Sequence, residues 1–131
     1  MKVVIADDTL KSQMQAYLTL RTRHSCEIAE DRETVIRLVH EYQPDVIIIS
    51  LKFDSKNDSN GEWEHLVEEL KQTKTSLKLI GISNGDDEVL EAKAREIGLQ
   101  VIMHRPVQRR KLLEIIADKG NQNSSKEENG K

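Results

Sequence analysis

Short apolar runs alternate along the chain with longer stretches in which apolar residues recur every three or four positions. The runs are Val3–Ile5, Cys26–Ile28, Val46–Ile49, Leu79–Ile82 and Val101–Met103. Runs of this length that are rich in Val and Ile are typical of strands, and the stretches between them are typical of amphipathic helices. This regular alternation indicates an α/β fold, in which helices cover both faces of a parallel sheet.

Five helices are expected, each with one apolar face turned toward the sheet. The residues that define these faces are three or four positions apart, as one side of a helix requires. They are Leu10, Met14 and Leu18; Val35, Leu38, Val39 and Tyr42; Leu66, Val67 and Leu70; Leu90, Ala94 and Ile97; and Leu112, Leu113 and Ile116. Asp86 and Asp87 suit the start of the fourth helix, and Gly98 suits its end.

The chain is expected to form one domain over residues 1–119, followed by a tail over residues 120–131. Its length of 131 residues and mass of 15.0 kDa match a single core. After Lys119 the sequence reads GNQNSSKEENGK, which contains no aliphatic or aromatic residue to bury. We therefore expect this tail to be disordered.

Composition and charge exclude several classes of protein. The 20 basic and 23 acidic side chains give a net charge of -3, which offers no broad positive field for nucleic acid. The apolar runs are far shorter than the roughly 20 residues needed to cross a bilayer. The single Cys26 cannot form an internal disulfide, as is typical of a reducing compartment. We expect a cytoplasmic protein that binds neither nucleic acid nor a membrane directly.

Polar residues with useful chemistry stand where the predicted strands end. Asp7 and Asp8 directly follow the first strand, Ser50 ends the third, Ser83 ends the fourth, and Arg105 follows the fifth. In open parallel sheets, the ligand crevice lies beyond the carboxyl ends of the strands. Adjacent carboxylates repel one another unless a cation neutralises them, so the aspartate pair is a candidate Mg²⁺ site.

Taken together and in order, these segments resemble the receiver domain of two-component response regulators. The resemblance covers residues 2–119 and rests on the segments VVIADDT, QPDVIIIS, LIGISN, EAKAREIG and VIMHRPV. It implies a flavodoxin-like (βα)5 fold. In this three-layer sandwich, five parallel strands in the order 2-1-3-4-5 lie between two helices on one face and three on the other.

The same resemblance identifies positions at which this chain departs from a typical receiver. Ser50 stands where the family has the aspartate that accepts a phosphoryl group, and Arg105 stands in place of the lysine that contacts the phosphate. Ser83 matches the hydroxyl residue that senses the phosphate, while Ile102 replaces the switch tyrosine or phenylalanine. A serine hydroxyl is a poor nucleophile without a general base, so transfer from a histidine kinase is expected to fail at Ser50.

Arg105 is expected to pair with Asp7 or Asp8. Its guanidinium cannot lose its proton, and its planar fork suits carboxylates. We hypothesise that it permanently supplies the positive charge that Mg²⁺ supplies in a typical receiver. Binding of Mg²⁺ by the acidic pair is then expected to be weak or absent, and no cofactor is expected.

The chain is therefore interpreted as a pseudo-receiver, a phosphorylation-independent protein–protein interaction module of signal transduction and not an enzyme. Arg109, Arg110 and Lys111 form a basic patch at the start of the last helix, which favours an acidic partner. The resemblance implies that a signalling protein or a second copy docks on the face formed by the fourth helix, the fifth strand and the fifth helix.

A second interpretation stays open at this point. The domain is then a receiver that still accepts a phosphoryl group at a non-standard residue, with Mg²⁺ held by the aspartate pair. Asp54 and Asp58 lie in the polar segment that follows the third strand and border the site, and Ser50 is the third candidate.

Overall fold

The computed structural model describes residues 1–51, 53, 62–73 and 76–117, so the predicted tail lies outside the described residues. Strands and helices alternate along the chain. The strands are β1 (Lys2–Ala6), β2 (Ser25–Ala29), β3 (Val46–Ser50), β4 (Lys78–Ser83) and β5 (Val101–His104). The helices are α1 (Leu10–Leu20), α2 (Arg32–Glu41), α3 (Glu62–Thr73), α4 (Glu88–Glu96) and α5 (Arg109–Ala117).

The strands form one parallel sheet in the order β2-β1-β3-β4-β5, which confirms the predicted fold class. The central strand β3 pairs with β1 and β4, so that Ile48 lies between Ile5 and Ile80. Every residue of β3 is buried. A strand covered on both faces must be apolar on both sides, which explains its unbroken run of Val and Ile.

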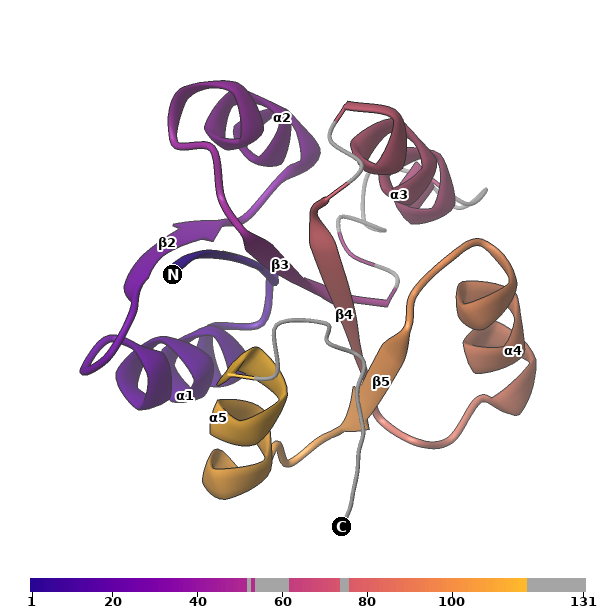
Figure 1. The fold of residues 1–131 in the computed structure, drawn as a ribbon. Helices are drawn as coiled ribbons and strands as arrows, with labels where there is room; N and C mark the ends of the chain where they lie inside the picture. Colours follow the sequence, from indigo (N-terminus) through magenta and orange to yellow (C-terminus); the bar gives the residue numbers. More distant parts are fainter. Residues whose placement is uncertain (52, 54–61, 74–75, 118–131) are drawn as a thin grey trace, which may run out of the picture.

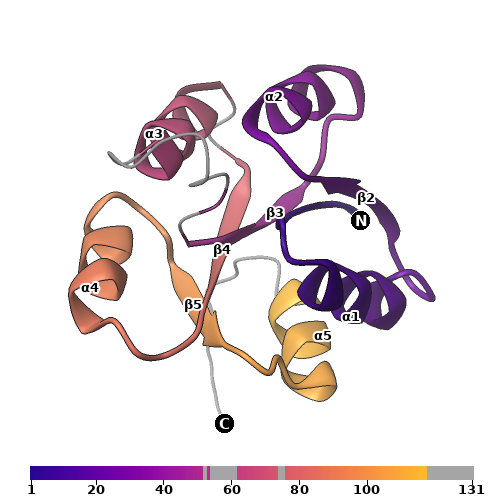
Figure 2. The ribbon, with the colours of Figure 1, turned by 180° about the vertical axis from the view of Figure 1, so that it is seen from behind.

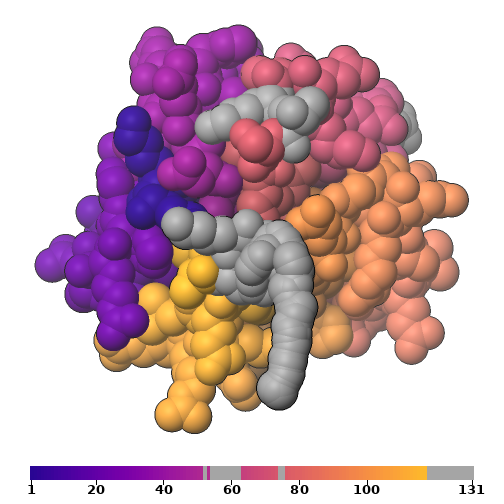
Figure 3. Space-filling view, in the orientation of Figure 1, coloured from indigo at the N-terminus to yellow at the C-terminus, as the bar shows by residue number. Residues whose placement is uncertain are grey.

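Helices lie on both faces of this sheet, α1 and α5 on one and α2, α3 and α4 on the other (Figures 1 and 2). Successive residues of a strand point to opposite faces, so each strand contributes to two cores. Val3 and Ile5 pack with α1 and α5, whereas Val4 packs with the other three helices. In space-filling form, α5 occupies the surface between the α1 and α4 sides (Figure 3).

The helix ends follow the expected chemistry. Asp31 precedes α2 and accepts a hydrogen bond from the Thr34 amide at 2.9 Å, and Asp87 precedes α4 and accepts one from the Leu90 amide at 3.0 Å. Gly98 follows α4 with φ +118°, a left-handed conformation that favours glycine. No described helix is long and apolar enough to cross a membrane.

The apolar face predicted for α1 is wrong. Leu10, Met14 and Leu18 are exposed, with relative exposures of 69%, 39% and 52%. The buried residues of α1 are instead Ser12, Gln13, Ala16 and Leu20. The two polar residues among them are buried because their polar atoms find partners inside the fold, which offsets the loss of water.

Candidate functional site

The predicted site residues meet at the carboxyl edge of the sheet. Parallel pairing continues there past the ends of two strands. The Asp7 amide bonds to the Ala29 carbonyl at 3.1 Å, and the Arg105 amide bonds to the Ser83 carbonyl at 2.8 Å. These backbone bonds hold Asp7 and Arg105 at the same edge as Ser50, the last residue of β3.

The two adjacent aspartates have different surroundings. Asp7 is buried, with 1% exposure, whereas Asp8 is exposed. The Oδ1 atom of Asp7 accepts a hydrogen bond from the Thr9 amide at 2.9 Å, and its carbonyl accepts one from the Gln13 side chain on α1. Only Asp7 therefore belongs to the interior of the site.

The Arg105 guanidinium lies at the centre of this edge. Its Nη2 atom donates to Ser50 Oγ at 2.8 Å and lies 3.5 Å from Asp7 Oδ2. Its Nε donates to Ser12 Oγ at 3.2 Å, and its Nη1 donates to Asn84 Oδ1 at 3.2 Å. The Arg105 side chain thus connects the end of β1, α1, β3 and the end of β4. We use the name Arg105 cluster for five residues: Asp7, Ser12, Ser50, Asn84 and Arg105.

The cluster neutralises a buried charge. An isolated carboxylate with 1% exposure would pay a large desolvation penalty, and a nearby cation offsets it. The Arg105 side chain is 22% exposed, so solvent moderates the attraction. Of the two carboxylates considered from the sequence, Asp7 is the one that Arg105 reaches.

This set of donor atoms fits Mg²⁺ poorly. The ion prefers several oxygen ligands, above all carboxylates. Asp7 Oδ2 already faces a guanidinium, and Ser50 offers a neutral oxygen that accepts from the same guanidinium. A divalent ion placed between them would be repelled by the Arg105 charge at close range. Among the described residues, no three His, Cys, Asp or Glu side chains are grouped so as to hold a metal.

Ser50 is poorly arranged as a nucleophile. Its side chain is buried, and its Oγ accepts from Arg105 while lying 3.4 Å from the Leu51 carbonyl, to which it donates. A guanidinium on one lone pair withdraws electron density from the oxygen, the opposite of what a general base does. Asp54 and Asp58, the other acceptors considered, lie outside the described residues.

A second polar chain runs from β4 through α4 to β5. Ser83 Oγ donates to Glu91 Oε2 at 2.6 Å and accepts from the Gly85 amide at 3.0 Å. His104 Nε2 lies 2.9 Å from Glu91 Oε2. The Ser83 hydroxyl therefore bonds toward α4, and we call these three side chains the Ser83–Glu91–His104 chain.

The Glu91 carboxylate is the charged member of this chain. The hydrogen bond from Ser83, and then that from His104, lowers the pKa of Glu91 below its usual value. Sequence reasoning missed this contact because its partners are separated along the chain and meet only through the sheet. The sequence did contain one signal that Glu91 is buried: it stands three residues before Ala94 and therefore on the apolar face of α4.

Ile102 takes part in packing at this end of the sheet. It is half-buried against the core of α2, α3 and α4, and it lies opposite Gly81 in the register of β4 and β5. A Cβ at Gly81 would come within 3.2 Å of Leu99 and 3.5 Å of Ile102. Ile102 thus shares the space beside Gly81 with Leu99 and Leu51.

The predicted basic patch is divided between two sides of α5. Arg109 and Arg110 line a hollow together with Arg23, whereas Lys111 is not among its lining residues. Because successive residues of a helix point about 100° apart, three neighbours cannot share one narrow face.

No protein-family model matches the chain, and no curated protein matches its sequence. Solved structures do match its fold. NtrX from Brucella abortus superposes with a TM-score of 0.78 at 15% identity, over 90% of this chain but only 25% of NtrX. A response regulator from Thermotoga maritima matches with a TM-score of 0.76 at 13% identity, over 90% of this chain and 95% of that one.

A response regulator receiver domain protein from Methanospirillum hungatei gives a similar match. The TM-score is 0.77 at 18% identity, over 90% of this chain and 91% of that one. At these identities the likeness concerns the fold, and this chain has the fold of receiver domains.

Proposed function

We propose that this chain is an atypical receiver, a pseudo-receiver, and that it acts in signal transduction as a phosphorylation-independent protein–protein interaction module. One observation carries the proposal: Arg105 Nη2 donates to Ser50 Oγ at 2.8 Å. A permanent cation therefore rests on the residue at the acceptor position.

The chemistry of phosphoryl transfer supports this proposal. The acceptor must direct a lone pair at phosphorus, in line with the leaving group, while cations neutralise the oxygens of the transferred group. The Ser50 oxygen instead uses a lone pair to accept from Arg105. Arginine stays protonated over the physiological pH range, so this arrangement does not open by titration.

The contact between Arg105 and Asp7 supports a domain that works without Mg²⁺. In the proposal, Arg105 permanently neutralises Asp7, and the acidic pair binds Mg²⁺ weakly or not at all. Mg²⁺ can leave a typical receiver, whereas the Arg105 guanidinium is covalently part of the chain, so the positive charge at this site is always present. A module of this kind does not respond to phosphate, and its output comes from contacts that it makes constitutively.

The surface made by α4, β5 and α5 is the proposed docking face for a signalling protein or a second copy of the chain. The Ser83–Glu91–His104 chain supports this choice, because it bonds β4, α4 and β5 into one arrangement. The net charge of -3 disfavours direct binding of nucleic acid. We place this module in the cytoplasm and assign it no enzymatic reaction.

Incubation with acetyl phosphate and Mg²⁺, followed by intact-mass measurement, tests the proposal. We expect the native protein to keep its mass, because neither the acceptor nor the metal site is arranged for transfer. A stoichiometric phosphoryl adduct on the native protein would contradict this. Fragmentation would then locate the adduct on Ser50, Asp54 or Asp58 and establish the phosphorylatable receiver instead.

A pair of variants provides the matched control. Ser50→Asp combined with Arg105→Lys restores both residue types of a typical receiver, and we expect this double variant to gain one phosphoryl group. Ser50→Asp alone leaves the guanidinium in place to pair with the new carboxylate, so its labelling is expected to be slower. Equal labelling of the two variants would show that Arg105 does not obstruct the site.

A further inference from the structure

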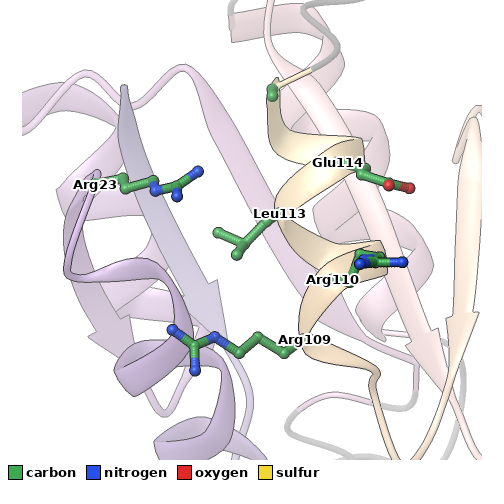
Figure 4. Close-up of a pocket in the computed structure, with 6 residues that line it drawn as sticks. Arg23, Arg109, Arg110, Leu113 and Glu114 are labelled. Atoms are coloured by element: carbon green, nitrogen blue, oxygen red, sulfur yellow. The ribbon is translucent and has the colours of Figure 1, made fainter.

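A hollow of about 420 Å³ lies between α5 and the segment that joins α1 to β2 (Figure 4). It shares no residue with the Arg105 cluster or with the Ser83–Glu91–His104 chain. Its lining residues are Arg23, Arg109, Arg110, Leu113, Glu114 and Ala117. We call this hollow the α5 groove.

Two guanidinium groups flank an apolar side chain in the α5 groove, while Arg110 and Glu114 point to the other side of α5 (Figure 4). Figure 4 shows Leu113 pointing from α5 into the space between Arg23 on one wall and the extended side chain of Arg109. Leu113 is half-buried, and Ala117 lies one turn further along α5. The groove thus combines a small apolar surface with positive charge on both sides.

This charge is largely uncompensated. Three arginines and Glu114 line the groove, which gives it a local net charge of +2 in a chain whose net charge is -3. Across the described part of the chain, the ion pairs involve other residues. An isolated positive region on an acidic protein attracts and orients anionic partners.

The arginines and the apolar surface together favour some anionic partners over others. Arginine forks bind carboxylates in pairs of parallel hydrogen bonds. An amphipathic segment presents an apolar side chain with acidic side chains one helical turn away, which matches Leu113 between the arginines. Single-stranded nucleic acid is a poorer match, because no aromatic side chain lines the groove to stack on its bases.

We propose that the α5 groove docks an acidic amphipathic segment of a partner protein. An apolar side chain of that segment packs on Leu113 and Ala117, and its carboxylates pair with Arg23 and Arg109, which flank Leu113. The inference rests on the proposed function, since it names the chemistry of the partner. The groove lies on the side of α5 that faces α1, so the bound segment extends the proposed partner contact beyond the face formed by α4, β5 and α5.

Fluorescence anisotropy with a synthetic probe tests this inference. The probe is a fluorescein-labelled peptide of Glu, Leu and Ala, with leucines three and four residues apart and glutamates on either side of them. We expect saturable binding to the native protein. Arg23→Glu and Arg109→Glu, whose side chains lie on either side of Leu113 in Figure 4, are each expected to weaken it about tenfold by like-charge repulsion.

Lys111→Glu is the matched control, because it makes the same charge change in the first turn of α5, two residues from Arg109 but outside the groove. We expect it to weaken binding less than about twofold, since exposed charges away from the contact are screened. A second pair separates the apolar contribution: Leu113→Ala is expected to weaken binding, and Ile115→Ala, half-buried on the same helix, is not. Circular dichroism confirms that each variant is folded.

Four results would overturn the inference. They are no saturable binding, equal losses for Lys111→Glu and Arg109→Glu, equal binding of a peptide with the same composition in scrambled order, and equally tight binding of a labelled oligothymidylate. Failure here is distinguishable from failure of the proposed function. The groove residues do not contact Ser50, so the mass measurement with acetyl phosphate is independent of the peptide measurement.

Discussion

The Arg105 cluster and the Ser83–Glu91–His104 chain lie at the same edge of the sheet, and they differ in what their charges can do. The first is organised by a guanidinium that keeps its proton, and its carboxylate, Asp7, has 1% exposure. The second joins a carboxylate to a histidine whose side chain is 55% exposed. The cation of the first group is an arginine, which keeps its proton, whereas in the second group hydrogen bonds lower the pKa of Glu91.

This difference separates two roles at one edge. In the Arg105 cluster, the guanidinium contacts Ser50 and the buried Asp7, so we expect this cluster to contribute mainly to the stability of the core. The Ser83–Glu91–His104 chain connects α4 to β4 through a buried hydrogen bond and to β5 through the exposed side chain of His104, where solvent weakens the contact. Substitutions that remove contacts from one group or the other test this difference, and their expected effects on the free energy of unfolding decrease from the Arg105 cluster to Glu91.

Arg105→Ala is expected to have the largest effect. It leaves Asp7 buried without its cation, and the free energy of unfolding is expected to fall by about 2–3 kcal/mol, less than the roughly 3–5 kcal/mol for a fully buried ion pair because Arg105 is partly exposed. Millimolar Mg²⁺ is expected to restore part of this loss, since the aspartate pair then lacks its internal cation. Urea denaturation with and without Mg²⁺ measures both effects.

Arg110→Ala is the control for this experiment. It removes an exposed arginine from α5 and is expected to change the free energy of unfolding by less than about 0.5 kcal/mol, with no response to Mg²⁺. If Arg105→Ala is as stable as the native protein in both conditions, Arg105 does not compensate the charge of Asp7.

Ser83→Ala is expected to have an intermediate effect. It removes the donor to Glu91 and the acceptor of the Gly85 amide, both at a buried position, and is expected to cost about 1–2 kcal/mol. Ser25→Ala makes the same change at an exposed strand end, where the hydroxyl contacts Tyr42, and should cost less. Equal losses in thermal denaturation would mean that the Ser83 hydroxyl contributes no special bond.

The pH dependence of stability is expected to show the smallest effect. The pKa of Glu91 is lowered from 4.5 in the folded state by Ser83 and His104, with a smaller contribution from Arg95. Its stabilising contribution is therefore complete above pH 4.5 and is lost as the pH falls through the lowered value.

Glu91→Gln, which cannot ionise, removes this dependence. The native protein is expected to lose more stability than Glu91→Gln on acidification, by about 1 kcal/mol or less because His104 is half exposed. Parallel pH profiles for the two proteins, measured by urea denaturation, would show that Glu91 has the same pKa in the folded and unfolded chains.

Much of the fold follows from local sequence. The run Val46–Ile49 has apolar residues on both sides of the strand, which only an interior position of a covered sheet satisfies, and it is buried at the centre. The face of α1 was not predictable in the same way. Gln13 and Ser12 are buried through hydrogen bonds to residues far away in sequence, and the count of apolar residues does not reveal such partners.

In the candidate site, too, the placement of residues was predictable from the sequence but their contacts were not. Ser50 ends a predicted strand, and Asp7 and Arg105 each directly follow one, so parallel topology alone brings them to one edge. Their distances, and the choice of Asp7 over Asp8, depend on which side chain turns inward. Glu91 was missed because a helix does not reveal which strand ends it faces, and His104 meets it only through the β4–β5 register.

The most direct test of the Arg105 cluster is an amide NMR titration of the native protein with Mg²⁺ and then with beryllofluoride, a mimic of the phosphoryl group. If the guanidinium permanently occupies this site, the amide signals of Asp7, Ser50, Ser83 and Arg105 will keep their positions throughout. Saturable shifts of those signals that require both Mg²⁺ and beryllofluoride would contradict the account, because they would show a working phosphoryl site beside Ser50.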